Sequence, residues 1–331
     1  MGEVSEAHSL IEQIEALGER LRGARESIGR VILGQEAVVE QTLVTLLAGG
    51  HVLLVGVPGL GKTRLVETLG TVMGLDERRV QFTPDLMPAD ILGSEVLEET
   101  PEGRRAFRFL PGPVFCQLLM ADEINRASPR TQSALLQAMQ ERKVAVGGRT
   151  LALPAPFHVL ATQNPIEQEG TYPLPEAQLD RFLLEVEVTY PDAAAERAML
   201  LATTGAQEAR ATPAMTAEEL LAAQQLIRRI PVGEQVVDAI LRLVRGARPG
   251  DEGLPVVRET LAWGPGPRAA QALMLATRAR AVLDGRLAPS VEDVLALAEP
   301  VLRHRMALSF AARSDGVRLS EVIAALKASI A

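Results

Sequence analysis

Residues 51–63 read HVLLVGVPGLGKT, and this stretch decides the fold. Its first five residues form a short, mainly apolar run of the kind found in buried parallel strands. Residues 56–63 fit the pattern G-x-x-x-x-G-K-[ST] at every fixed position, and a helix is expected from about 62 to 73. A strand, a glycine-rich loop and a helix in this order predict a site for nucleotide phosphates, because backbone N–H groups and the positive helix N-terminus converge on the loop.

Each residue type in this loop has a physical role in binding ATP. The glycines let consecutive backbone N–H groups curl around the phosphates. Lys62 is predicted to reach the β- and γ-phosphates, and the Thr63 hydroxyl to ligate Mg²⁺. ATP and Mg²⁺ are therefore the expected cofactors. The predicted ATP contacts in the loop are Gly56, Val57, Pro58, Gly59, Leu60, Gly61, Lys62, Thr63 and Arg64.

An acidic pair ends a later apolar run. Residues 118–121 read LLMA and are followed by Asp122 and Glu123. A magnesium–nucleotide site needs a carboxylate at the end of a neighbouring strand, so Asp122 is expected to hold the metal, usually through water. Glu123 is expected to orient or deprotonate the attacking water. The phosphate loop and this pair together predict Mg²⁺-dependent hydrolysis of ATP.

Strands and helices alternate through the first part of the chain. Helical stretches lie between most of the further strand candidates, which are residues 79–83, 117–121, 157–162 and 182–188. This alternation predicts a doubly wound parallel sheet within a three-layer α/β/α core. Two segments, near 94–110 and 142–154, interrupt the alternation with strand-like residues on either side of a turn. We expect each of them to be an inserted β-hairpin.

The last third of the chain differs from the first part. No further strand is expected beyond Tyr190 and Pro191, and the apolar periodicity there predicts only helices. The predicted fold class is therefore an α/β core followed by an all-α domain. We expect the core at residues 1–200 and the helical domain at 201–331, with the boundary inside the Ala- and Thr-rich stretch 200–213. The predicted helices are 217–229, 234–247, 267–284, 291–306 and 319–330.

Charge and composition narrow the function. The formal net charge is −8 and the sequence pI is about 5.3, so the chain lacks the broad basic surface that drives non-specific nucleic-acid binding. The single cysteine, Cys116, cannot form an intramolecular disulfide. Neither a signal peptide nor a long apolar run typical of a membrane span is recognised. A cytoplasmic protein is the resulting expectation.

Three polar residues outside these motifs are candidates for the site. Asn164 ends the strand candidate at 157–162 within Gln163-Asn164-Pro165, where it either fixes the water between Glu123 and the γ-phosphate or serves as a turn residue. Arg181 opens the last strand candidate, and Arg268 begins a helix. Taken alone, each arginine is typical of a surface charge or an ion-pair partner.

The motifs together resemble the AAA+ superfamily and, within it, the MoxR family of ATPases. The resemblance runs from about Val31 to Arg268 and beyond. One departure is Gly264-Pro265-Gly266-Pro267-Arg268, where relatives often have Gly-Ala-Ser-Pro-Arg. The segments that carry the resemblance, besides the phosphate loop, are ILGQ (32–35), GHVLL (50–54), QFTPDLMPADILG (81–93), ADEINRA (121–127), ATQNP (161–165) and LPEAQLDRF (174–182).

The resemblance implies roles for particular residues and an architecture. Gly34 and Gln35 would lie near the adenine, and Asn164 would be the polar sensor of the γ-phosphate. Arg181 would be the arginine finger. Arg268 would be the sensor arginine of a helical lid, acting on its own nucleotide or on a neighbour's. The chain would form a homo-oligomer, most often a hexameric ring.

The resemblance also implies a biological role. MoxR-like proteins act as remodelling or assembly chaperones, with von Willebrand factor A domain proteins as partners and protein complexes as clients. Two alternatives are a nucleic-acid motor or loader, since helicase relatives share the hairpins, and a nucleotide-gated scaffold with negligible turnover. The intact catalytic residues argue against the scaffold, and the acidic charge makes nucleic acid an unexpected partner. The hairpin charges fit either a binding surface or simple solvation; they are Arg104, Arg105, Arg108, Arg142, Lys143 and Arg149.

Overall fold

The computed structural model describes residues 2–99, 105–167, 170–205 and 209–330. Its centre is a five-stranded parallel sheet with the strand order β2-β5-β8-β1-β9. Each of the five predicted strands contributes one member of this sheet, so the predicted α/β class is confirmed. The bounds are β1 (Val52–Val55), β2 (Glu77–Gln81), β5 (Leu118–Asp122), β8 (His158–Gln163) and β9 (Leu184–Glu187).

The strand order determines which loops meet. β8 lies between β1 and β5, and all three run in the same direction. The loops after these strands therefore emerge at one edge of the sheet, as in other open α/β folds whose ligands bind outside the carboxyl ends of the strands. The phosphate loop follows β1, the acidic pair ends β5, and Asn164 follows β8.

Helices cover both faces of the sheet, and several of their ends carry the expected caps. In α5, for example, Ser128 caps the N-terminus by accepting from the Thr131 N–H, and Pro129 occupies the first turn. The predicted helix after the phosphate loop is α3, which has left-handed glycines, Gly61 and Gly74, at its two ends. The helices of this part are α1 (Gly2–Gly29), α2 (Glu36–Leu47), α3 (Lys62–Met73), α4 (Pro88–Leu92), η1 (Ile124–Arg126), α5 (Pro129–Glu141), α6 (Glu176–Leu179) and α7 (Ala193–Thr204).

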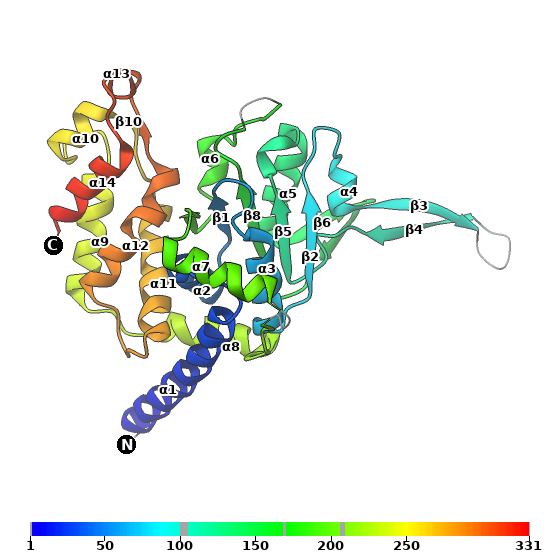
Figure 1. The fold of residues 1–331 in the computed structure, drawn as a ribbon, viewed down its shortest axis with the longest axis horizontal. Helices are drawn as coiled ribbons and strands as arrows, with labels where there is room; N and C mark the ends of the chain where they lie inside the picture. The colour runs from blue at the N-terminus through cyan, green and yellow to red at the C-terminus, as the bar shows by residue number, and fades with distance from the viewer. Residues whose placement is uncertain (1, 100–104, 168–169, 206–208, 331) are drawn as a thin grey trace.

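Both predicted hairpins are present. β3 (Gly93–Glu99) pairs antiparallel with β4 (Arg105–Pro111), and this hairpin projects from the body of the molecule on the side opposite the C-terminal helices (Figure 1). β6 (Lys143–Val146) pairs antiparallel with β7 (Arg149–Ala152). The predicted turn of the first hairpin and its Arg104 lie outside the described residues.

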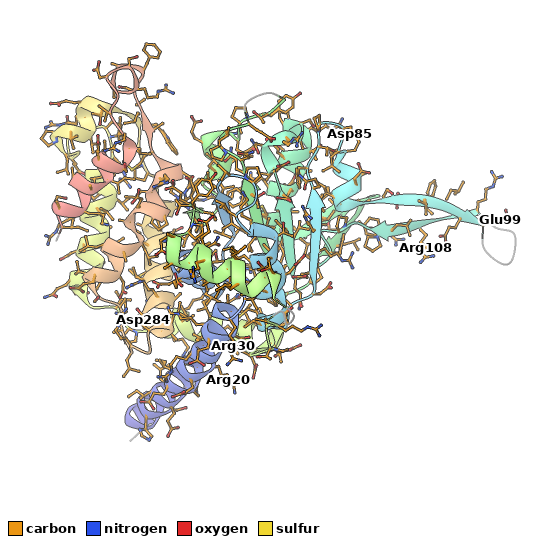
Figure 2. All side chains as sticks on the ribbon, in the orientation of Figure 1. Arg20, Arg30, Asp85, Glu99, Arg108 and Asp284 are labelled. Carbon is orange, nitrogen blue, oxygen red and sulfur yellow. The ribbon has the colours of Figure 1, made fainter. Side chains whose placement is uncertain are left out.

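Charge on the projecting hairpin is mixed, whereas we had expected a basic surface. Figure 2 shows Glu99 and Arg108 on its two strands. Arg108 donates to Glu98 at 3.2 Å, and Glu95 faces the second hairpin at Gly147. Arg142, which we assigned to the second hairpin, instead ends α5 in a left-handed conformation with φ of 52°. The described part of these hairpins is therefore less basic than the arginine and lysine positions alone indicated.

The C-terminal part is mainly helical, as predicted, with one exception. A short antiparallel pair joins β10 (Leu261–Trp263) to β11 (Ala307–Leu308), so the prediction that no strand follows Tyr190 is wrong. Strands of two or three residues have too few positions to produce a readable alternation of apolar and polar side chains. The helices of this part are α8 (Ala217–Arg229), α9 (Glu234–Gly246), α10 (Pro255–Thr260), α11 (Pro267–Leu283), α12 (Val291–Leu302), η2 (Arg303–Arg305), α13 (Phe310–Ser314) and α14 (Leu319–Ala328).

The helical part and the core are joined by a shared apolar interior and by ion pairs. Arg280 on α11 donates to Glu40 on α2 at 2.9 Å and to the fully buried Asp293 on α12 at 2.5 Å. One cluster of buried apolar side chains has members in both parts, among them Leu43 on α2 and Leu273 on α11. The domain boundary at residues 200–213 stays a prediction. In the described residues, no helix is both long and apolar enough to cross a bilayer.

Three buried histidines predict a stability that falls in acid. Burial lowers the pKa of His51 to about 3, that of His158 to about 4, and that of His304 well below its ordinary value of 6.5. Between these values and 6.5 the unfolded chain binds protons that the folded chain does not, so stability decreases as pH falls. Each histidine contributes up to about 1.4 kcal/mol per pH unit to the free energy of unfolding in that window.

Urea unfolding measured at several pH values below 6.5 tests this expectation. His158→Gln should lower the slope of the free energy of unfolding against pH by an amount equivalent to about one bound proton. Equal slopes for His158→Gln and the unchanged protein would contradict the assignment.

Candidate functional site

The residues that follow β1, β5 and β8 line one cavity of about 350 Å³. It lies at the carboxyl edge of the sheet, where the strand order brings the three loops together. The structure therefore brings the phosphate loop, the acidic pair and Asn164 together, while their roles in binding and catalysis stay predictions. The lining residues are Pro58, Gly59, Leu60, Gly61, Lys62, Thr63, Arg64, Asp122, Glu123, Thr162 and Asn164.

The loop glycines are required for two different reasons. Gly59 and Gly61 have φ values of 85° and 71°, a region that glycine occupies at little cost. A Cβ on either would meet nothing within 4 Å, so the space before them is open to a ligand. At Gly56, in contrast, a Cβ would lie 2.5 Å from the Val188 carbonyl oxygen. Gly56 therefore allows close packing of the loop against the end of β9.

Lys62 extends over the loop from the first turn of α3. Its ammonium donates to the carbonyl oxygens of Gly56 and, at 3.0 Å, of Val57. Partial burial lowers the pKa of Lys62, while the nearby carboxylates of Asp122 and Glu123 oppose that shift. A cation in a partly desolvated cavity interacts strongly with phosphate oxygens, as the sequence-based assignment of Lys62 requires.

Thr162 fixes the geometry of the acidic pair, and it was missed from the sequence. Its hydroxyl donates to Asp122 Oδ1 at 2.6 Å and accepts from the Glu123 backbone N–H at 2.8 Å. The other Asp122 oxygen accepts from Arg79 on β2 at 2.5 Å. Thr162 can make both contacts because β8 is the direct neighbour of β5. A sequence signal for it existed, since Thr162 is the polar end of an apolar strand.

Glu123 is held in an unusual conformation. Its backbone is left-handed, with φ of 56° and ψ of 51°, which costs a non-glycine residue about 1–3 kcal/mol. Glu123 Oε2 accepts from Gln81 at 2.8 Å and from Arg126 at 3.0 Å. These contacts fix the direction of the carboxylate at the rim of the cavity. Gln81 and Arg126 were not among the predicted site residues, because their contact with Glu123 depends on the fold.

Gly34, Gln35 and Asn164 occupy different positions around the loop. Gln35 is buried and donates to the Leu60 carbonyl oxygen at 2.9 Å, so it braces the phosphate loop from outside the cavity. Gly34 has φ of 69°, and a Cβ there would clash with Ala195. Asn164 lines the cavity and is 5% exposed, and its Oδ1 accepts from the Ile166 N–H at 3.1 Å. Only Asn164 of these three faces the cavity.

Arg181 and Arg268 meet in a second cavity, of about 270 Å³. Arg142 and Arg305 line it as well, and none of its lining residues also lines the phosphate-loop cavity. Burial and the nearby Arg268 lower the pKa of Arg181. We call this second cavity, lined by these four arginines, the arginine cavity. It has the charge expected of a binding site for an anion.

The two cavities lie at opposite ends of the parallel strands, the first at their carboxyl ends and the arginine cavity at their amino ends. The phosphate loop follows Val55 at the carboxyl end of β1, whereas Arg181 precedes Leu184 at the amino end of β9. β1 and β9 are parallel, and Val52 is paired with Leu184. A strand of this length spans about 10 Å, and the loops add to that distance. In the described structure, Arg181 is therefore remote from the phosphate loop of its own chain.

The donors in the first cavity fit a magnesium–nucleotide complex. Thr63 offers a hydroxyl and Asp122 a carboxylate, and Mg²⁺ in nucleotide sites typically uses one or two protein ligands together with phosphates and water. Among the described residues, no group of three or more His, Cys, Asp or Glu side chains forms a separate metal site.

The parallel sheet, the phosphate loop and the acidic pair define a P-loop nucleotide hydrolase with a helical second domain. Comparison with known proteins agrees. A family model described as the ATPase family associated with various cellular activities (AAA) matches residues 51–184, and a model of the AAA lid domain matches residues 255–326. The helical part therefore contains an AAA lid.

Similarity to individual proteins makes the family assignment of this chain more specific. The chain is 43% identical to "Chaperone MoxR1" of Mycobacterium tuberculosis over 313 residues, which cover 94% of this chain and 82% of the relative. It is 34% identical to "Protein MoxR" of Paracoccus denitrificans, covering 88% and 89% of the two chains. A crystal structure of a candidate ATPase from Cytophaga hutchinsonii superposes with a TM-score of 0.89 at 35% identity and covers 98% of both chains. This chain belongs to the MoxR family of AAA+ ATPases.

Proposed function

We propose that this ATPase works as a ring, most simply a hexamer, in which each nucleotide lies between two subunits. One observation carries the proposal: Arg181 and Arg268 share a cavity at the sheet edge opposite their own phosphate loop. In a head-to-tail arrangement the arginine cavity of one subunit faces the phosphate loop of the next, and such heterologous contacts form a ring when the rotation from one subunit to the next closes. Arg268 then acts in trans, together with Arg181.

The residues at the phosphate loop divide the chemistry of hydrolysis. Lys62 and the loop N–H groups hold the β- and γ-phosphates. Thr63 and Asp122 would hold Mg²⁺, which would supply positive charge that offsets the charge of the phosphates. Glu123 accepts a proton from the attacking water, and Asn164 orients that water. In-line attack requires the Glu123 carboxylate to be aimed at the water, and its contacts with Gln81 and Arg126 fix the direction of that carboxylate at the rim of the cavity.

In this proposal the ring uses ATP hydrolysis to remodel or assemble protein complexes in the cytoplasm. The relationship to a protein named a chaperone supports this role. We further propose a protein with a von Willebrand factor A domain as the partner. The projecting hairpin β3–β4 supports a protein client, because it exposes Leu97 and Phe107 as a cross-strand pair beside both acidic and basic side chains. Mixed apolar and polar surfaces of this kind are typical of protein interfaces.

DNA and RNA are expected neither to bind appreciably at physiological salt nor to stimulate ATP hydrolysis. A nucleic-acid motor must neutralise several phosphates, but the net charge is −8, and Arg108 on the hairpin is paired with Glu98. A candidate partner with a von Willebrand factor A domain should instead bind in a nucleotide-dependent way and change the turnover rate. ATPase assays with DNA, RNA and the partner, each at low and high salt, measure both effects.

The hairpin arginines provide the decisive variant. Salt-sensitive stimulation by nucleic acid that is lost when Arg105, Arg108 and Arg149 become Ala would favour the motor over the chaperone. Leu97→Ser with Phe107→Ser should weaken the response to the protein partner without changing basal hydrolysis, because both side chains are exposed and the hairpin β3–β4 that carries them projects from the body of the molecule (Figure 1).

A further inference from the structure

Arg305 is a buried arginine that belongs to the lid but bonds to the core. It lies in η2 and is 2% exposed. Its guanidinium donates to Asp180 Oδ1 at 2.7 Å, and to the carbonyl oxygens of Phe182 at 2.6 Å and Leu183 at 3.1 Å. A further bond at 2.6 Å reaches the Val301 carbonyl oxygen within the lid. Arginine has five donors in a rigid fork, and this site uses them on two separate parts of the fold.

The core segment that Arg305 binds is the segment that carries Arg181. The bonds to Asp180 on one side and to Phe182 and Leu183 on the other leave Arg181 between fixed neighbours. His304, the residue before Arg305, also contacts the Phe182 carbonyl oxygen, at 3.1 Å. A buried charge is costly unless it is fully bonded, so changing Arg305 disturbs this whole segment.

Asp180 connects the Arg305 contact with Arg268, another arginine of the arginine cavity. Its Oδ1 accepts from Arg305, while its Oδ2 lies 3.7 Å from Arg268 Nη1 on α11. One carboxylate therefore lies between two lid arginines, one buried and the other half exposed. The backbone of Arg181 and the side chain of Arg268 are thus fixed to a common group.

We propose that Arg305 is the positioning residue of the arginine finger. By holding residues 180–183 against the lid, it aims Arg181 into the arginine cavity and makes Arg181 and Arg268 move together with the lid of their own subunit. The inference rests on the proposed action of Arg181 across the subunit boundary. It adds that the lid of the subunit donating the finger controls catalysis at the neighbouring nucleotide.

Arg303 offers a matched control. It lies in the same short helix and also joins the lid to the core, through Glu187 on β9, and it has a second pair with Glu299. Within the described residues, the Arg303 guanidinium bonds to Glu187 and Glu299 and not to residues 180–183. A general role in attaching the lid predicts similar losses for Arg303 and Arg305 variants. A role in aiming the finger predicts a loss of turnover for Arg305 alone.

Arg305→Lys keeps the charge but removes the fork, and Asp180→Asn keeps the side-chain size but removes the charge. A catalytic group misplaced by roughly 1 Å can lose about 10²-fold in rate, so kcat should fall by about that factor in both variants. The affinity for ADP, measured by titration calorimetry, should stay near that of the unchanged protein. Arg303→Gln should retain most of the turnover. Unfolding by urea, measured for all three variants, separates lost turnover from lost structure.

Mixing variants identifies which subunit carries the defect. Arg305→Lys subunits mixed with Lys62→Ala subunits should regain activity, since some interfaces then pair an intact phosphate loop with an intact finger. The same Arg305→Lys subunits mixed with Arg181→Ala subunits should gain nothing, because both lack a working finger. The opposite pattern, activity regained with Arg181→Ala and not with Lys62→Ala, would mean that Arg305 serves its own nucleotide and would overturn the inference.

A further mixture tests the underlying proposal separately. If Arg181→Ala and Lys62→Ala subunits fail to complement each other, the action of Arg181 in trans is wrong, whatever Arg305 does. If they complement while Arg305→Lys with Lys62→Ala does not, only the positioning role of Arg305 is wrong.

Discussion

Arg181→Ala is expected to lower kcat for ATP hydrolysis by roughly 10³–10⁵-fold with little change in nucleotide affinity. The guanidinium stabilises charge that develops on the γ-phosphate in the transition state, so its loss affects turnover more than binding. Arg181 lies in the arginine cavity, apart from the phosphate loop of its own chain. The measurement is steady-state phosphate release over a range of ATP concentrations. Arg313→Ala, at an exposed position on α13, is the control and should be unaffected.

Mixing two inactive variants tests whether Arg181 acts on the nucleotide of a neighbouring subunit. Mixtures of Arg181→Ala and Lys62→Ala subunits should hydrolyse ATP faster than either alone, since one supplies the loop and the other the finger. Specific activity of the unchanged protein should rise with protein concentration as subunits assemble. A monomer that turns over as fast as the assembly would show that Arg181 is not a trans finger.

Glu123→Gln is expected to bind ATP and to stall hydrolysis, with a loss of roughly 10²–10⁴-fold, the range typical of a missing general base. Glutamine preserves the size of the side chain and its contact with Gln81, but it cannot take the proton from water. The metal ligand Asp122 is unchanged, so nucleotide binding should persist. Binding and phosphate release measured side by side on the same sample separate the two steps.

Lys62→Ala provides the contrasting result. It removes the ammonium that lies over the loop, so affinity for ATP itself should fall. The two variants should therefore differ in kind, one defective in turnover and the other in binding. Full turnover by Glu123→Gln would exclude Glu123 as the base and direct attention to another group at the cavity rim.

The sequence alone determined the features that depend on neighbouring residues. The phosphate loop, the five strands and both hairpins are encoded by short runs of apolar, glycine and turn residues, and each is present in the structure. The loop conformation is local as well, since Gly59 and Gly61 have the positive φ that their residue type allows. The acidic pair was recognisable because it directly follows the apolar run at residues 118–121. Family resemblance supplied candidates such as Arg181 and Arg268 but no position for them.

Tertiary structure alone decided which distant residues meet. A parallel strand returns through a long crossover, so strand order is not written in any local pattern, and β8 lies between β1 and β5 only in the folded sheet. That order makes Thr162 a bridge between Asp122 and Glu123. Likewise, lid and core must pack before Arg305 can bind the segment that carries Arg181. These contacts join residues 39 to 125 positions apart, and they form because buried charges and hydroxyls must find partners wherever the packing brings them.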